Sequence, residues 1–312
     1  MKKTKHLSSL SLTAIIVIII GIIIGWSLWR QPEVEIATGS KLQVTVSMPL
    51  LRNLVEEIGG DQVEVTSIIN GPSCNHHYEP TSGDLIKATR SALFIKAGMG
   101  FDPWVDHLIE SSGKIEAALD ASIGIVPMVI EPSGSEGQDQ HADDDHHTGN
   151  PHYWGSPENV KIMAENILNG LIEVLPEKKD YFIHNYREYL AKLDKVVVEL
   201  KKEAASVPDK KVASYSAAFL YLYRYFGFDN LATVETTCEQ EVSPRRLAEV
   251  VAKVKANQVK VVVGETIYPK LPENLARETG AELVLLWPTT NESGDYLETL
   301  AENVKKLVAA LQ

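Results

Sequence analysis

The sequence predicts an α/β protein made of two doubly wound parallel-sheet lobes, joined by one long rigid helix and preceded by an N-terminal transmembrane anchor. Three observations lead to this fold class. Strand-like runs alternate with stretches of helical period in both halves of the chain, a pattern typical of parallel sheets. Between the halves a helical pattern continues for about 30 residues. Near the N-terminus an apolar run is long enough to cross a bilayer.

The composition is that of a globular protein with an acidic surface. A chain of 312 residues provides one large domain or two medium ones. Hydrophobic residues make up 44% and charged residues 23%, which argues against general disorder. The net charge of −12 argues against a nucleic-acid partner, because such proteins present a basic face. An anionic surface instead attracts cations.

Residues 1–37 are expected to form a membrane anchor or a signal segment. Three lysines stand among the first five residues, and an apolar run follows from about Leu10 to Trp29. Roughly 20 apolar residues suffice for a membrane-spanning helix, whereas a cleaved signal peptide has an apolar core of about 7–15. We therefore favour a single uncleaved anchor over cleavage and secretion. The lysines favour a cytoplasmic N-terminus, which places the rest of the chain on the extracytoplasmic face of the cell membrane.

The two halves of the remaining chain begin alike. Each opens with a β-rich run, from Lys41 and from Lys210, followed by a serine, an amphipathic stretch, a glycine-containing stop and a second β-rich run. Each half then continues with a further helical stretch and an apolar strand. We expect an N-terminal lobe at residues 38–175 and a C-terminal lobe at residues 208–312.

The lobes are connected by helical sequence. Ser156 and Pro157 are typical of a helix start, and the pattern then continues to about Val174. After Pro176, apolar residues recur at helical spacing across residues 176–207, which predicts one long linking helix. A helix of that length acts as a strut and predicts limited hinge motion between the lobes.

Six of the nine histidines gather in two short stretches. His76 and His77 lie in "NGPSCNHHYEP", a loop punctuated by glycine and proline. The others belong to the His- and Asp-rich stretch at residues 131–151 or follow it directly, and they are His141, His146, His147 and His152. Imidazole and carboxylate groups suit zinc-type ions. The stretch at residues 131–151 is therefore predicted to collect metal through His141, His146 and His147. The alternative is a polar insert without a role.

These residues carry a resemblance to a known family. The segments "HHYEPT", "NPHYWGSPENV" and the tail from "VVVGETIYP" onward resemble the zinc/manganese-type solute-binding proteins of ABC importers. The likeness extends from about residue 41 to the end. It implies two lobes joined by a long helix, with a divalent metal captured in the cleft between them. It also implies an ABC permease and its ATPase as partners.

Carried over residue by residue, the resemblance assigns His76 and His152 as two metal ligands. Ser216 and Trp287 stand where the family has its other two ligands. A serine hydroxyl is a poor zinc ligand, and an indole nitrogen only donates hydrogen bonds. His77 is the expected variable residue between the first ligand and the Tyr-Glu-Pro-Thr motif.

Other side chains are candidates to complete the coordination. In doubly wound sheets, ligands bind beyond the carboxyl ends of the strands, where Glu265 and Cys238 are expected, and Cys74 lies beside His76. Three interpretations of the two cysteines remain open: a disulfide across the cleft, thiolate ligands, or unrelated buried thiols. Glu265 is either an oxygen ligand, a partner of a ligand, or a carboxylate that caps a helix or joins the lobes.

The expected function is that of a monomeric extracytoplasmic receptor that captures a divalent metal and hands it to the permease. Histidine and thiol groups favour Zn²⁺, with Mn²⁺ or another transition metal as the alternative. Tyr78 and Glu79 are expected to hold the loop rather than touch metal. One alternative is a divergent paralogue that binds another small ligand or a metallophore, with Trp287 stacking on it. A metallohydrolase is disfavoured because neither H-E-x-x-H nor G-x-S-x-G occurs, so we expect no enzyme.

Overall fold

A computed structural model describes most of the chain after residue 40. The described residues are 41–71, 78–113, 118–129, 149–235 and 242–312. All of them belong to one compact unit that runs from Lys41 to Gln312. The anchor predicted at residues 1–37 lies outside the described residues. Within the ranges given above, no helix combines the length and the apolar character needed to cross a membrane.

The N-terminal lobe is built on a four-stranded parallel sheet in the order β2-β1-β3-β4. Its strands and helices are β1 (Leu42–Val46), α2 (Pro49–Gly59), β2 (Val63–Ser67), α3 (Ser82–Arg90), β3 (Leu93–Lys96), α4 (Trp104–Ser112) and β4 (Ala118–Asp120). Val44, Thr45 and Val46 of the inner strand β1 are almost completely buried, and because successive side chains point to opposite faces, both faces of this strand are covered. Pro49 stands in the first turn of α2, where its missing N–H costs no hydrogen bond.

The C-terminal lobe repeats this topology. Its parallel sheet has the order β10-β9-β7-β8, which becomes the order of the first sheet when the strands are counted from β7. The elements are β7 (Lys211–Ser216), α7 (Leu220–Phe226), β8 (Asp229–Glu235), α8 (Pro244–Ala256), β9 (Val261–Glu265), α9 (Lys270–Thr279), β10 (Glu282–Leu286) and α10 (Tyr296–Leu311). Residues 261–263 are fully buried, which explains the unbroken apolar run of β9.

The strand order determines where each sheet can bind a ligand. In such sheets the crevice opens beyond the carboxyl ends of the two strands between which the order reverses. In the C-terminal lobe these strands are β7 and β9, which are direct neighbours and end at Ser216 and Glu265. In the N-terminal lobe they are β1 and β3. The structure therefore confirms an α/β fold with two parallel sheets.

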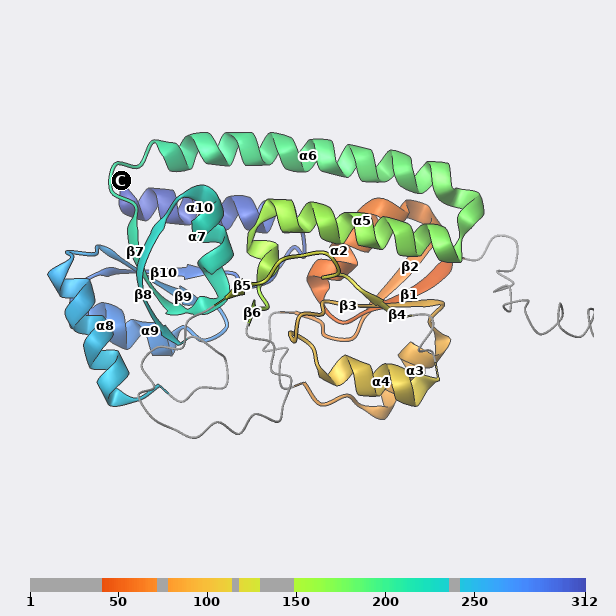
Figure 1. Cartoon of the computed structure of the whole chain (residues 1–312), viewed down its shortest axis with the longest axis horizontal. Helices are drawn as coiled ribbons and strands as arrows, with labels where there is room; N and C mark the ends of the chain where they lie inside the picture. Colours follow the sequence, from red (N-terminus) through yellow and green to blue (C-terminus); the bar gives the residue numbers. More distant parts are fainter. Residues whose placement is uncertain (1–40, 72–77, 114–117, 130–148, 236–241) are drawn as a thin grey trace, which may run out of the picture. The chain divides into compact units, whose positions relative to one another are not determined.

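The long helix is present as α6 (Lys179–Ala205), which follows α5 (Pro157–Val174). At 1.5 Å per residue its 27 residues extend about 40 Å. Figure 1 shows α6 running alongside α2 and α5 at one end and α10 at the other, and contacts with all three agree. Ser156 precedes α5 as expected, but its side chain accepts no capping hydrogen bond.

A small antiparallel pair, β5 (Met128–Val129) and β6 (Gly149–Asn150), was not expected from the sequence. The sequence assigns residues 149 and 150 to the His- and Asp-rich loop. Strands of two residues carry no periodic signal, and they form here because partners distant in the chain come together. A 3₁₀ turn, η3 (Tyr153–Gly155), then leads into α5.

Candidate metal centre

The structure describes only part of the predicted coordination. His152, Glu265, Ser216 and Trp287 lie among the described residues. The other predicted site residues, namely Cys74, His76, His77, His141, His146, His147 and Cys238, lie outside them. Among the described residues, no group of three or more His, Cys, Asp or Glu side chains is arranged to hold a metal ion. The proposed ligand set therefore stays a prediction.

His152 is a buried histidine held by a neighbouring asparagine. It lies in the chain between β6 and η3, and only 7% of the residue is exposed. The Oδ1 atom of Asn150 lies 3.0 Å from the backbone nitrogen of His152 and 3.1 Å from its ring Nδ1. The Nδ2 group of Asn150 donates to the carbonyl oxygen of Ala217 at 2.8 Å. The imidazole is thus connected to the C-terminal lobe through one side chain.

Aromatic side chains surround the imidazole. The ring of Phe101 contacts His152 edge-on at a centroid distance of 5.4 Å, and the ring of Trp154 does so at 5.5 Å. Both aromatic residues are almost completely buried, and they pack on each other at 4.6 Å. Apolar walls of this kind lower the local dielectric constant, which strengthens the interaction between a ligand atom and a cation.

Hydrogen bonds from both lobes hold the segment that carries His152. Tyr153 donates from its hydroxyl to the carbonyl of Ala97, which directly follows β3. Trp154 donates from Nε1 to the carbonyl of Pro288 in the C-terminal lobe at 2.8 Å. The Tyr296 hydroxyl of α10 donates to the carbonyl of Trp154 at 2.9 Å. Burial raises the pKa of both hydroxyls, Tyr153 and Tyr296, well above the ordinary value of tyrosine. Both therefore keep their proton and remain donors at any physiological pH.

A buried carboxyl group supports the loop beside this segment. Asp102 accepts hydrogen bonds from the backbone N–H groups of Ala97 and Gly98 at 2.7 and 2.9 Å. Burial raises the pKa of Asp102 above its ordinary value, and these hydrogen bonds partly offset the rise. Phe101, which contacts His152, directly precedes Asp102 in the chain, so Asp102 fixes one wall of the imidazole pocket.

In the C-terminal lobe, the positions that carry ligands in the resembled family have other tasks. The Ser216 hydroxyl accepts from the backbone N–H of Ala218 at 3.1 Å and caps the short turn η5 (Ala217–Phe219). The Trp287 indole N–H donates to Glu302 of α10 at 2.9 Å. Glu265 is half-buried at the carboxyl end of β9. Of the two neighbouring strand ends, Ser216 of β7 and Glu265 of β9, the second therefore provides a carboxylate.

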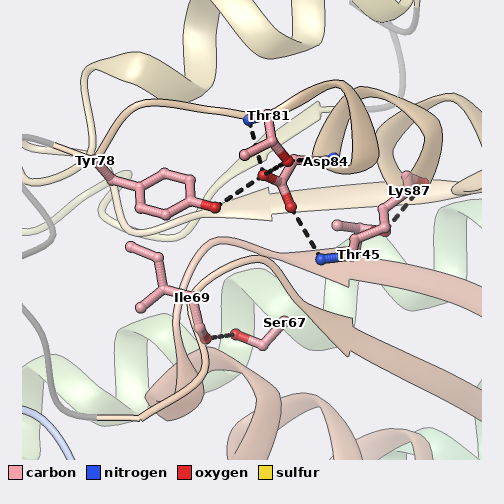
Figure 2. Close-up of polar contacts among 7 residues, drawn as sticks. All are labelled: Thr45, Ser67, Ile69, Tyr78, Thr81, Asp84 and Lys87. Atoms are coloured by element: carbon pink, nitrogen blue, oxygen red, sulfur yellow. Dashed lines mark hydrogen bonds and ion pairs between the residues drawn. The ribbon is translucent and has the colours of Figure 1, made fainter.

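In the N-terminal lobe, the chain is anchored directly after residue 77. The Tyr78 hydroxyl donates to Oδ2 of Asp84 at 2.8 Å (Figure 2). The Tyr78 ring also packs on the ring of Trp104 at a centroid distance of 4.9 Å. Burial and the hydrogen bond to Asp84 raise the pKa of Tyr78 to about 12. The structure agrees with the expectation that Tyr78 holds the loop.

Sequence reasoning missed the residues that surround His152. Asn150 could have been found locally, because an Asn-Pro pair favours a turn in which the asparagine side chain accepts a backbone N–H two residues later. Phe101 and Asp102 stand about 50 residues away, and no sequence signal pairs them with His152.

Comparisons with known proteins agree with the fold. The family model described as "Zinc-uptake complex component A periplasmic" matches residues 44–310. The iron-binding protein YfeA of Yersinia pestis is 27% identical over 248 residues, covering 78% of this chain and 76% of that protein. The manganese ABC transporter substrate-binding lipoprotein PsaA of Streptococcus anginosus is 26% identical over 233 residues, or 72% of each chain.

Two further proteins complete the comparison. The zinc-binding lipoprotein AdcA of Streptococcus pneumoniae is 25% identical over 278 residues, which is 86% of this chain and 55% of that protein. Among solved structures, a crystal structure of ZnuA superimposes with a TM-score of 0.76 at 27% identity, covering 88% of this chain and all of that one.

Proposed function

Because the chain belongs to the family of the periplasmic zinc-uptake complex component A, we propose that it is the substrate-binding component of an ABC importer for a divalent transition metal. It captures the ion on the extracytoplasmic side and delivers it to a permease with its ATPase. The relatives are named for iron, manganese and zinc, and they support the class of substrate rather than one metal. Among these metals we favour Zn²⁺, because imidazole and thiol groups suit it.

The setting of His152 carries this proposal. It is a buried imidazole with a hydrogen-bonded Nδ1, on a segment that both lobes hold, and it matches a family ligand position. We propose His76 as the second imidazole ligand, with Cys74, Cys238 and Glu265 as candidates to complete the coordination. The lobes proposed at residues 38–175 and 208–312 supply ligands from opposite sides, with the linking helix at 176–207.

Metal binding by the full-length chain in detergent tests the proposal. The chain is stripped of metal, titrated with Zn²⁺, Mn²⁺ and Fe²⁺ against a competing chelator, and analysed for bound metal. We expect one equivalent of metal. Loss of a hydrogen-bond partner of a ligand already costs about 10–100-fold in affinity, so His76→Ala and His152→Ala should each cost at least as much.

His184→Ala is the matched control, because this imidazole lies on α6 with its side chain 69% exposed. It should bind like the wild type. Retention of wild-type affinity by both the His76→Ala and His152→Ala variants would exclude the proposed site. A wild-type chain without saturable metal binding would favour the alternative of another small ligand. Repeating the titration with Cys74→Ser and Cys238→Ser, under reducing and oxidising conditions, separates thiolate ligands from a disulfide.

Two further parts of the proposal have independent tests. Alanine at His141, His146 and His147 should slow metal association and leave the equilibrium affinity nearly unchanged, because a collecting loop acts before the final site. The segment at residues 1–37 is proposed as an uncleaved anchor. The full-length chain should then keep its N-terminal residues and stay with the membrane fraction after alkaline washing.

A further inference from the structure

Asn150 is completely buried and is bound on both sides of its amide group. Its Oδ1 atom faces the backbone N–H and the ring Nδ1 of His152, at 3.0 and 3.1 Å. Its Nδ2 atom lies 2.8 Å from the carbonyl oxygen of Ala217. The Tyr221 hydroxyl donates to the backbone carbonyl of Asn150 at 3.1 Å. The C-terminal lobe therefore holds both the side chain and the main chain of this residue.

The orientation of the amide follows from its backbone partners. A carbonyl oxygen only accepts hydrogen bonds, so the group facing Ala217 must be the NH₂ of Asn150. A backbone N–H only donates, so the group facing the His152 nitrogen must be the amide oxygen. That same oxygen faces Nδ1 of His152, and because it can only accept, Nδ1 must carry the proton. In the neutral ring, the lone pair is therefore on Nε2.

We propose that Asn150 is the positioning residue of the His152 ligand, holding the proton on Nδ1 and directing the lone pair of Nε2 to the transported cation. This inference rests on the proposed function. Metal-binding histidines usually donate their other ring N–H to a fixed acceptor, which sets the tautomer and the ring orientation. Asn150 is such an acceptor, and Ala217 fixes it from the second lobe.

The position of the acceptor gives it a second consequence. Ala217 directly follows β7, the strand that ends at Ser216 beside β9. The hydrogen bond from Asn150 to Ala217 thus ties the orientation of the His152 ring to the carboxyl end of the second sheet. The contact between the lobes and the orientation of the His152 ring are therefore coupled through the amide group of Asn150.

Two substitutions separate positioning from simple structural support. Asn150→Asp keeps oxygen acceptors for Nδ1 and the backbone N–H of His152, but it cannot donate to Ala217. Asn150→Leu has a similar volume and loses both kinds of bond. Both variants lose the bond to Ala217 and should lose stability. Only Asn150→Leu loses control of the tautomer.

The measurement is made on the full-length chain in detergent with ¹⁵N-labelled histidine rings. Two-bond ¹H–¹⁵N correlation spectra distinguish a protonated ring nitrogen from one with a lone pair, and His152→Ala identifies the resonance. In the metal-free wild type at a pH where the ring is neutral, we expect Nδ1 protonated and Nε2 unprotonated. Asn150→Asp should keep this pattern, and Asn150→Leu should show mixed tautomers. Zn²⁺ titration should show about 10–100-fold weaker binding for Asn150→Leu than for the wild type. Asn150→Asp should bind Zn²⁺ clearly more tightly than Asn150→Leu, because it keeps the acceptor for Nδ1.

The outcomes distinguish this inference from the proposed function. A wild-type ring with its proton on Nε2 overturns the inference without any variant, even if the chain binds metal. Equal Zn²⁺ affinity of Asn150→Leu and wild type also overturns it and leaves the proposed function standing. Equal losses in both variants indicate structural support only, and likewise overturn it. Absence of metal binding by the wild type overturns both.

Discussion

Asp84 is predicted to stabilise the N-terminal lobe through its charge, and Asp84→Asn tests this. The carboxylate is 2% exposed and lies in the first turn of α3 (Figure 2). Its Oδ2 atom accepts from the Tyr78 hydroxyl at 2.8 Å and from the backbone N–H and hydroxyl of Thr81 at 2.9 and 2.6 Å. Its Oδ1 atom accepts from Lys87 at 2.9 Å. Asparagine can keep the three Oδ2 contacts, but only as bonds to a neutral oxygen.

The magnitude follows from the difference between charged and neutral acceptors. A hydrogen bond to a charged group contributes about 1.5–3 kcal/mol and one between neutral groups about 0.5–1.5 kcal/mol. The loss is at most about 1 kcal/mol for each of these three partly buried bonds, so the free energy of unfolding should fall by up to about 3 kcal/mol. Lys87 is partly exposed and can turn to solvent, so its bond adds little. Urea unfolding at neutral pH, followed by circular dichroism, measures the change.

The pH dependence provides a second check on the same substitution. Burial alone would raise the pKa of Asp84, but hydrogen bonds from Thr81, Lys87 and Tyr78 outweigh it and lower the pKa below its ordinary value. Because the folded-state pKa lies below the unfolded one, the stabilisation is complete above the unfolded pKa of about 3.9 and is lost as the pH falls further. The difference between wild type and Asp84→Asn should therefore narrow below about pH 4.

Asp106→Asn is the matched control, because Asp106 also pairs with a lysine, Lys96 at 2.5 Å, but is 65% exposed. Its loss should cost no more than about 1 kcal/mol. Equal losses of stability in Asp84→Asn and Asp106→Asn at neutral pH would contradict the role of the buried charge. A difference between wild type and Asp84→Asn that stayed constant from neutral pH to below the ordinary pKa of aspartate would contradict it as well.

Three further substitutions test the packing of this molecule by urea unfolding. Gly155→Ala would place a Cβ atom 3.0 Å from the backbone nitrogen of Leu222 and should cost about 1–3 kcal/mol, and an unchanged stability would contradict the tight approach. Gly83→Ala, exposed in α3 with no contact closer than 3.5 Å, should instead stabilise by about 0.5–1 kcal/mol. Trp154→Phe leaves the buried carbonyl of Pro288 without its donor and should lower the free energy of unfolding by about 1–3 kcal/mol. An unchanged free energy of unfolding would show that this hydrogen bond does not stabilise the fold.

The helices were the most predictable part of the fold. The pattern that ends near Val174 and the helix start at Pro157 agree with α5, because a proline in the first turn and an amphipathic period are local signals. The prediction of a helix across 176–207 agrees with α6, whose buried residues recur every three or four positions from Tyr189 to Ala204. These features depend only on residues that are close together in the chain, so they can be predicted from the sequence.

The strand order could not be predicted in this way. Alternation of strands and helices indicates parallel sheets, but it does not say whether the third strand pairs with the first or the second. That choice depends on which side each connecting helix crosses. The pairing of β7 with β9, which brings Ser216 and Glu265 to neighbouring strand ends, is therefore a structural finding.

The same distinction between local and distant contacts explains how far the candidate site could be predicted. His152 was identifiable because a histidine after Asn-Pro in this motif carries a local signature. The bond from Asn150 to the His152 backbone is also local, since it closes a turn of two residues. The bond from Asn150 to Ala217 joins residues 67 positions apart, and only the folded chain reveals it. A histidine becomes a directed ligand only when its second nitrogen has a fixed acceptor, and here the element that fixes this acceptor belongs to the other lobe. The candidate ligand was thus accessible to sequence reasoning, whereas the orientation of its ring depends on how the two sheets meet.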